Sequence, residues 1–238
     1  MHGSIHQKNI SDSGFTIVNN IYSGDEINEM IRLIEQTDQS NKTFRKSEDL
    51  FAIRQFLKEV PLTKERIFNH RLKTLINGLF GGGYSVVKSI YFDKPEASNW
   101  FVAWHQDLTI SVDRKIHLPG YGPWTTKLDQ FAVQPPLDIL QENFTIRIHL
   151  DDTDEGNGAL KVISGSHLKG IWRTDDFGSQ TEAAISCNVR AGGVMIMRPL
   201  LMHASNRTTT HKRRRVIHIE FSKVQLPDEL KWAERETI

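Results

Sequence analysis

The spacing of the apolar residues changes once along the chain, near Tyr84, and this change restricts the possible folds. Before Tyr84, apolar residues recur every three or four positions, as in amphipathic helices. After it, short runs rich in Val, Ile, Phe and Thr alternate with Gly, Pro, Asn and Asp. Many short strands separated by turn residues are typical of a sandwich or barrel. We therefore expect a mainly β protein, a double-sheet jelly roll with flanking helices packed outside it.

The helical part is expected to span about residues 15–83. Ser23 and Glu26 have the spacing of a capping box, in which each side chain binds a free amide of the first helical turn. Two further helices are predicted over 50–60 and 64–80. The first of these would stop before a proline and the second at a run of three glycines.

A jelly-roll core is expected over about 84–222, within a single domain that takes in the whole chain, 1–238. The predicted strands are 85–92, 101–105, 144–150, 160–163, 194–197 and 216–221. The segment 111–143 fits no strand pattern, because it is long, is rich in Pro and Gly, and carries several aromatic residues. We predict that it forms a lid-like insert over a pocket. A surface loop held down by its aromatic residues is the alternative.

The charge and the chain ends indicate where such a protein works. The formal net charge is +1, so the chain has no general attraction for nucleic acid or membrane surfaces. The polar N-terminus lacks the apolar segment of a signal peptide, and the single cysteine, Cys187, fits a reducing compartment. The basic run 211–215 could contact nucleic acid, but alternation along a strand would turn Arg214 away from its neighbours. We therefore expect a cytoplasmic protein with no nucleic-acid or membrane partner.

Two potential metal ligands stand close together in the sequence. His105 and Asp107 are separated by one residue of an extended segment, so they project to the same face. His203, which follows the apolar strand 194–197, is the best candidate for a third ligand. Two histidines and one carboxylate form the facial triad of non-haem iron(II) oxygenases. Zinc is the competing metal for the same donor set.

Arg214 lies eleven residues after His203, at the head of the predicted strand 216–221. Its planar guanidinium can bind a carboxylate through two parallel hydrogen bonds, which a lysine cannot do. A dicarboxylate co-substrate that chelates iron at one end would need such a partner at the other end. Ser205, two residues after His203, could donate a hydroxyl hydrogen bond to the same carboxylate.

Several segments match a known family in both order and spacing. They are 99–107 (NWFVAWHQD), 147–152 (RIHLDD), 157–167 (NGALKVISGSH) and 203–205 (HAS), followed by Arg214. Through these segments the chain resembles the phytanoyl-CoA dioxygenase family, which includes ectoine hydroxylases, over about residues 14–221. The resemblance implies a double-stranded β-helix, iron(II) as the metal, and 2-oxoglutarate as co-substrate.

The resemblance also implies roles for individual residues. The family's metal-ligand positions fall on His105, Asp107 and His203. Arg214 falls on the co-substrate anchor and Ser205 on a neighbouring co-substrate contact. Arg147 lies on a core strand where family members place a pocket-lining residue, sometimes Trp, so its role stays open. Lys88, on the strand before the metal motif, is a further pocket candidate.

The implied function is a 2-oxoglutarate-dependent dioxygenase, which uses dioxygen to hydroxylate a small-molecule substrate and releases succinate and carbon dioxide. A CoA thioester and a small polar metabolite both remain possible as the substrate. Two alternative functions remain: a jelly-roll binding protein without turnover, and a non-oxidative metal-binding protein on a cupin-like scaffold. Oxygen consumption coupled to succinate formation would separate the oxygenase from both.

Three further features have a structural and a functional interpretation. His167, in a Gly-Ser-His turn, is expected to be structural. His149 shares a strand face with Arg147, and it either lines the pocket or is a hydrogen-bonded core residue. The acidic cluster at 151–154 has oxygens that suit calcium or magnesium, but we expect a solvated turn.

Overall fold

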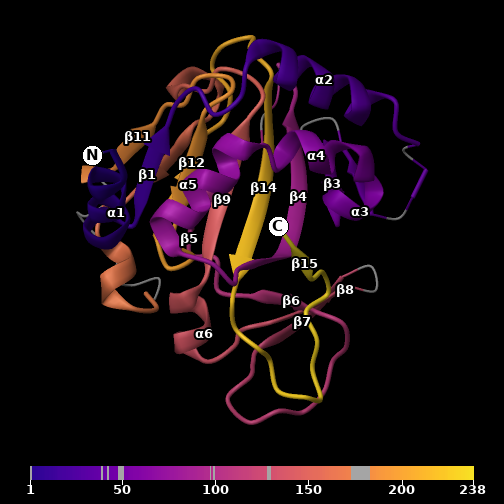
Figure 1. Ribbon diagram of the computed structural model, residues 1–238, viewed down its shortest axis with the longest axis vertical. Helices are drawn as coiled ribbons and strands as arrows, with labels where there is room; N and C mark the ends of the chain where they lie inside the picture. The colour runs from indigo at the N-terminus through magenta and orange to yellow at the C-terminus, as the bar shows by residue number, and fades with distance from the viewer. Residues whose placement is uncertain are drawn as a thin grey trace.

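A computed structural model of the chain describes residues 2–38, 40–41, 43–47, 51–96, 98, 100–127, 130–172 and 183–238. Two antiparallel sheets form its centre (Figure 1). The larger has the order β1 (Phe15–Val18), β12 (Val194–Met197), β9 (Phe144–His149), β14 (Arg214–Ser222), β4 (Ser85–Lys94), β3 (Phe51–Arg54) and β2 (Phe44–Lys46), and β15 (Glu236–Thr237) also pairs with β4. The smaller has the order β11 (Ile185–Cys187), β10 (Leu160–Val162), β13 (His203–Ser205) and β5 (Val102–His105). This arrangement confirms the predicted mainly β jelly roll.

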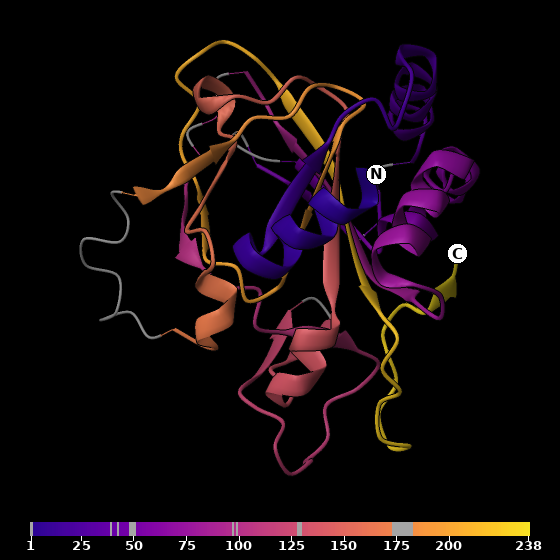
Figure 2. The same ribbon diagram turned by 60° about the vertical axis from the view of Figure 1, so that its left-hand side comes forward.

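Helices cover one face of the larger sheet and the smaller sheet lies on the other side (Figure 2). The covering helices are α2 (Gly24–Glu35), α3 (Phe56–Glu59), α4 (Lys64–Ile67) and α5 (His70–Phe80). Their apolar residues form one core with the outer face of the sheet, and a second cluster joins β1 and β12 to β10 and β11. Two other helices, α1 (His2–Ser13) and α6 (Leu137–Glu142), lie toward the edges of the molecule. Among the described residues, no helix has the length and apolar character needed to cross a membrane.

Alternation along the central strands separates an apolar face from a polar one. On β9, Ile146 and Ile148 belong to the core beneath the helices. On β14, Ile217 and Ile219 belong to the same core. Successive side chains of a strand point to opposite faces, so the residues between these isoleucines point toward the smaller sheet. The inner residues of both strands are largely polar, and this polar face positions the candidate site.

The helical part agrees only partly with its prediction. The capping box of α2 is confirmed, since Ser23 Oγ accepts from the Glu26 amide and Glu26 Oε2 accepts from the Ser23 amide. The helix predicted over 50–60 is wrong, because 51–54 form β3 and only Phe56–Glu59 is helical. Residues of β3 find ladder partners on β4, and this pairing overrides local helix propensity. Leu50 lies outside the described residues.

The helix predicted over 64–80 is interrupted. Asn69 lies in the extended conformation between α4 and α5, and its side chain accepts a hydrogen bond from the Leu72 amide at 2.9 Å. Asparagine is a strong helix N-cap, because it satisfies an amide that the helix leaves free. The single predicted helix is therefore two helices, which meet at Asn69.

The segment 111–143 is not the irregular excursion that its Pro and Gly residues indicated. It carries β7 (Trp124–Lys127), β8 (Gln130–Val133) and α6, and with β6 (Ile110–Val112) it forms a three-stranded sheet. This sheet lies at one end of the molecule beside the C-terminal segment (Figure 1). Val112 pairs with Trp232 there, and the Trp232 ring packs into the apolar core of the insert. Whether the insert acts as a lid stays a prediction.

Candidate metal centre and co-substrate site

The structure brings together the three side chains that the sequence singled out as metal ligands. His105 ends β5 and His203 begins β13, and the two residues are paired across these strands. One ligand atom from each of His105, Asp107 and His203 lies within 4.8 Å of the others. The Asp107 carboxylate is 4.0 Å from His105 Nε2 and 3.9 Å from His203 Nε2. Its backbone amide donates to the Pro199 carbonyl at 2.9 Å, which ties the segment after β5 to the turn before β13.

Hydrogen bonds from both rings leave the same nitrogen free. His105 Nδ1 is 2.8 Å from the Ala103 carbonyl, and His203 Nδ1 is 2.8 Å from the Leu201 carbonyl. Because a carbonyl oxygen can only accept, each Nδ1 carries the hydrogen and each Nε2 keeps its lone pair. Both Nε2 atoms lie near the Asp107 carboxylate. A metal-binding histidine likewise donates from one ring nitrogen to a hydrogen-bond acceptor and keeps the other nitrogen free for the metal.

The electrostatics of the cluster also suit a divalent cation. Burial alone would raise the pKa of Asp107, but the nearby His203, His218 and Lys88 outweigh it and hold this pKa well below its usual range. Burial lowers the pKa of His203 to about 4. At neutral pH the cluster therefore presents an ionised carboxylate and a neutral imidazole. The buried Oδ2 of Asp107 has no hydrogen-bond partner, so it is free to bind a metal.

The cluster is open on one side. The His105 side chain is 40% exposed, whereas that of His203 is 5% exposed. A catalytic metal needs positions that its protein ligands do not fill, in contrast to the closed shell of a structural site. Exposure on the His105 side provides the access that further ligands would need.

Beside the cluster, two buried arginines on neighbouring strands form what we call the arginine pair, Arg147 and Arg214. Nε of Arg147, and both Nε and Nη1 of Arg214, are buried without a hydrogen-bond partner. Burial lowers the pKa of Arg147 to about 10. Burial and the nearby Arg147 lower that of Arg214 to about 9. Buried charges without a partner are costly, so the arginine pair fits an anionic ligand.

Comparison with known proteins agrees with the interpretation of His105, Asp107 and His203 as candidate metal ligands. A family model described as phytanoyl-CoA dioxygenase matches residues 10–216. The chain belongs to this family. The match takes in all three metal-binding candidates as well as Arg147 and Arg214. The family consists of iron(II)- and 2-oxoglutarate-dependent oxygenases, so the chain is an oxidoreductase of that class, as its motifs predicted.

Solved structures confirm the fold of the family. EctD from S. alaskensis, crystallised with 2-oxoglutarate and 5-hydroxyectoine, is 17% identical with a TM-score of 0.71, over 92% of this chain and 75% of that one. AviO1 from Streptomyces viridochromogenes Tue57 is 17% identical with a TM-score of 0.66, over 94% of this chain and 96% of that one. The α-ketoglutarate-dependent epimerase SnoN from nogalamycin biosynthesis is 14% identical with a TM-score of 0.66, over 93% and 80%. Iron is present in another EctD structure.

His218 and Glu220 are two buried residues of the site that the sequence analysis missed. Arg147 Nη1 donates to His218 Nδ1 at 3.1 Å, and His218 Nε2 in turn donates to Glu220 Oε1 at 3.1 Å. Lys88 donates to the same Glu220 oxygen at 2.7 Å. His218 and Glu220 follow Arg214 at even positions of one strand, so alternation from Arg214 would have located them on the inner face.

The atoms of Asp107, His218 and Glu220 form a second group with metal-binding chemistry. Its donors are already engaged, however. Both ring nitrogens of His218 take part in hydrogen bonds, and Glu220 Oε1 accepts from both His218 and Lys88. The free Nε2 atoms and the free carboxylate oxygen belong to the cluster of His105, Asp107 and His203, which is the better candidate for a metal site.

His149 and Ser205 lie near this site, and they differ in whether their polar atoms have hydrogen-bond partners. His149 Nδ1 is 2.8 Å from Thr153 Oγ1, its buried Nε2 has no partner, and burial holds its pKa well below the usual range. Ser205 Oγ donates to the Gly158 carbonyl at 2.8 Å. A hydrogen bond from Ser205 to a co-substrate would therefore require its hydroxyl to rotate. Asn99, the first residue of the metal motif, lies outside the described residues.

At the start of β14, Arg214 is separated from its two arginine neighbours, as alternation predicted. Arg213 pairs with Asp93 and Arg215 pairs with Asp151, while Arg214 points inward. Of the acidic cluster, Asp151 is thus a partner of Arg215. Asp154 caps a short 3₁₀-helix, Glu155–Asn157, by accepting from two of its amides. These carboxylates are structural.

The other singled-out residues lie apart from the metal cluster. His167 Nε2 donates to the Ser11 carbonyl at 3.0 Å, which ties its turn to α1 and agrees with a structural role. Cys187 is buried, and burial raises the pKa of its thiol to about 12. A thiol with so high a pKa is a poor nucleophile at neutral pH.

Proposed function

We propose that His105, Asp107 and His203 bind iron(II), and that Arg214 binds 2-oxoglutarate for the hydroxylation of a small-molecule substrate. The observation that carries this proposal is the position of the arginine pair beside three converging metal ligands. A dicarboxylate needs a metal at one end and a planar cation at the other. Bound iron(II) and 2-oxoglutarate would supply dioxygen activation, with succinate and carbon dioxide as products.

The chain's own residues select and orient the ligands. The two Nδ1 hydrogen bonds fix the imidazole rings of His105 and His203, so that Nε2 of each is directed toward Asp107. Arg214 binds the distal carboxylate of the co-substrate, and Arg147 adds a second positive charge on the same face. Arg147 is itself held by His218, so its guanidinium position depends on that ring.

Lys88 has an indirect part in this proposal. Its ion pair with Glu220 neutralises a carboxylate that would otherwise compete with Asp107 for the metal. Ser205 remains a candidate co-substrate contact if its hydroxyl turns away from Gly158. The insert 111–143 is proposed as the wall that excludes water from the site.

The test is coupled turnover. Purified protein with iron(II), 2-oxoglutarate and dioxygen should form succinate and consume dioxygen. Without a primary substrate, this uncoupled reaction should still proceed at a low rate. Asp107→Ala should abolish both signals. A non-oxidative metal protein would instead act anaerobically and without 2-oxoglutarate. Absence of succinate from iron-loaded protein under these conditions would contradict the proposal.

A further inference from the structure

A pocket of about 330 Å³ lies between the insert and strands β3 and β4 of the larger sheet. One wall comes from β3 and β4, with Arg54, Lys88 and Ile90. The opposite wall comes from the three-stranded sheet of the insert, with residues that include Phe131. The C-terminal segment closes a third side with Glu234. Four separate parts of the chain thus contribute to one cavity.

Lys88 connects this pocket to the metal cluster. It lines the pocket, and its Nζ also donates to Glu220 Oε1 at 2.7 Å. Glu220 in turn has an oxygen within 4.8 Å of an Asp107 carboxylate oxygen. None of the three metal-binding candidates lines the pocket itself. Lys88 and Glu220 thus link the cavity to Asp107, as side chains between a substrate pocket and a reactive centre would.

One charged group of the pocket has no partner among the described residues. The Glu234 carboxyl accepts from both the amide and the hydroxyl of Ser89, and Asp113 pairs with Arg114. Lys88 pairs with Glu220. The Arg54 side chain forms no ion pair or hydrogen bond within the described part of the chain.

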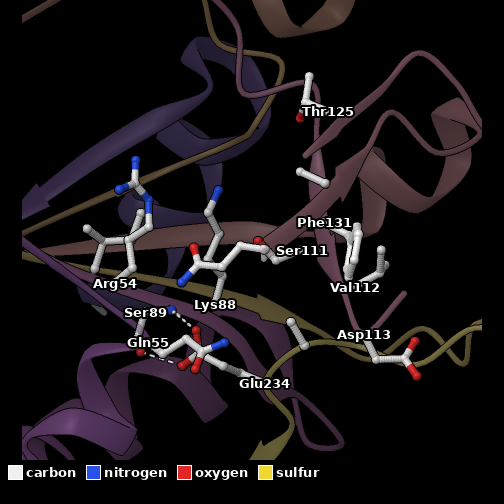
Figure 3. A pocket seen from close by; sticks show the side chains of 14 residues that line it. Arg54, Gln55, Lys88, Ser89, Ser111, Val112, Asp113, Thr125, Phe131 and Glu234 are labelled. Atoms are coloured by element: carbon white, nitrogen blue, oxygen red, sulfur yellow. Dashed lines mark hydrogen bonds between the residues drawn. The ribbon is translucent and has the colours of Figure 1, made fainter. Parts of the chain in front are cut away.

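The directions of these side chains favour a ligand. Figure 3 shows the Arg54 guanidinium and the Lys88 ammonium group pointing to the same side of the pocket, whereas Glu234 is turned toward Ser89. Phe131 lies across the cavity from the two cations. A half-buried guanidinium opposite an apolar wall is arranged to bind an anionic group that carries an apolar body.

We propose that this pocket receives the primary substrate, and that the substrate is a small organic acid whose carboxylate binds Arg54. The inference rests on the proposed function, since it names the substrate class of the same site. The carboxylate would lie between Arg54 and the insert, with the apolar body against Phe131 and Ile90. The remainder of the molecule would extend past Lys88 toward the metal.

The size of the pocket also bears on the choice of substrate. Ligand pockets of about 300 to 1,000 Å³ enclose most of a drug-sized molecule. A volume of about 330 Å³ is at the small end of that range, so the pocket cannot enclose a whole CoA thioester. The pocket therefore favours a small metabolite over the CoA thioester that the sequence left open.

The test compares the affinity for benzoate with that for benzamide, a neutral molecule of nearly the same shape. Calorimetric titrations are made under anaerobic conditions on protein already loaded with iron(II) and 2-oxoglutarate, so that the arginine pair is occupied. The unsubstituted protein should bind benzoate at least tenfold more tightly than benzamide. Arg54→Gln should remove this preference, and Arg54→Lys should keep part of it, because a point charge replaces a fork.

Arg45→Gln is the matched control. Arg45 lies on the neighbouring strand β2, is exposed and does not line the pocket, yet it carries the same charge close to Arg54. Its substitution should leave benzoate affinity unchanged within a factor of two. Equal loss in both variants would mean that benzoate responds to general surface charge, which would overturn the proposal.

Other outcomes also decide the matter. Equal benzoate binding by the unsubstituted protein and Arg54→Gln, or no benzoate binding at millimolar concentrations, would overturn the pocket assignment. Tighter Arg54-dependent binding of inorganic phosphate would overturn the carboxylate class. Succinate formation by the unsubstituted protein tests the proposed function separately. If benzoate binds through Arg54 but no succinate forms, the proposed function fails while the anion pocket stands.

Discussion

Arg147 and Arg214 lie on neighbouring strands, with both guanidinium groups buried on the face turned away from the helices, and neither pairs with a carboxylate of the described residues. Two like charges held close together in a buried space repel each other. A dianion would relieve this repulsion, so its binding should stabilise the fold. At a ligand concentration of 100 times the Kd, linkage alone gives about 2.7 kcal/mol.

The first prediction concerns Arg214→Lys. We expect the KM for 2-oxoglutarate to rise roughly 10- to 100-fold, because losing a charge-assisted hydrogen bond costs about 1.5–3 kcal/mol. Iron affinity should change little, since Arg214 is not a metal ligand. Steady-state succinate assays and metal titration measure the two quantities. Arg215→Lys is the control, because Arg215 pairs with Asp151 outside the site. Equal KM values for Arg214→Lys and the unsubstituted protein would exclude Arg214 as the anchor.

The second prediction concerns the carboxylate of the metal cluster. Asp107→Ala removes the only carboxylate of the three candidate ligands and leaves the two imidazoles. We expect iron(II) affinity to fall at least 100-fold, with succinate formation lost in parallel. Equilibrium dialysis against iron(II) under anaerobic conditions measures the affinity. Asp113→Ala, which removes a carboxylate paired with Arg114 on the insert, should bind iron normally.

The third prediction concerns the buried imidazole of His149. Burial holds its pKa far below that of an unfolded histidine, which is about 6.5. Below that pH the unfolded chain gains a proton that the folded chain does not take up. The stability that His149 contributes is therefore present above about pH 6.5 and is lost as the pH falls, by up to about 1.4 kcal/mol per pH unit.

Urea unfolding of the metal-free protein between pH 8 and pH 5 measures this effect. His149→Gln should lower the free energy of unfolding at pH 8, and the difference from the unsubstituted protein should shrink toward pH 5. His117→Gln, at an exposed position of the insert, is the control. A difference that stays constant over this range would show that His149 takes up its proton in the folded state.

The fourth prediction concerns the insert. Trp232 is 6% exposed, pairs with Val112, and donates from Nε1 to the Val224 carbonyl at 3.1 Å. Trp232→Ala should destabilise the packing by about 3–5 kcal/mol, as for other buried aromatic residues. Limited proteolysis should then cut 111–143 much faster. Leu137→Ala, at an exposed position of the same insert, should not change the cleavage rate. Unchanged cleavage of Trp232→Ala would mean that the insert holds together without the C-terminal segment.

The sequence predicted the candidate metal cluster because its chemistry is local. His105 and Asp107 share a strand face by spacing alone, and His203 was chosen for its place after an apolar strand. Arg214 was chosen for its planar guanidinium at the head of a predicted strand. His218 and Glu220 were missed, because the hydrogen bond of His218 with Arg147 and the ion pair of Glu220 with Lys88 form only when β14 lies beside β9 and β4.

The errors in the fold have a common cause. Residues 51–54 look helical in isolation, and they become a strand only because β4 offers them a ladder. The three-stranded sheet of the insert likewise depends on the distant Trp232, which completes its core. Partners far away in the chain leave no local signal. The double-sheet core was predictable, because β4, β9 and β14 are runs rich in Val, Ile and Phe that turn residues bound in the sequence itself.

Arg214 and Arg215 begin β14 and Arg213 directly precedes it, and of the three only Arg214 is buried on the face of the site. A shift of this strand by one residue would place Arg213 or Arg215 in the same position, so the arginines do not determine the register of the strand. Ile217 and Ile219 do determine it, because the same shift would remove them from the helix-covered core. Which arginine occupies the candidate site is therefore decided by two residues on the opposite face of the strand. In engineering this strand, substitutions at the isoleucines carry a risk of changing specificity as well as stability.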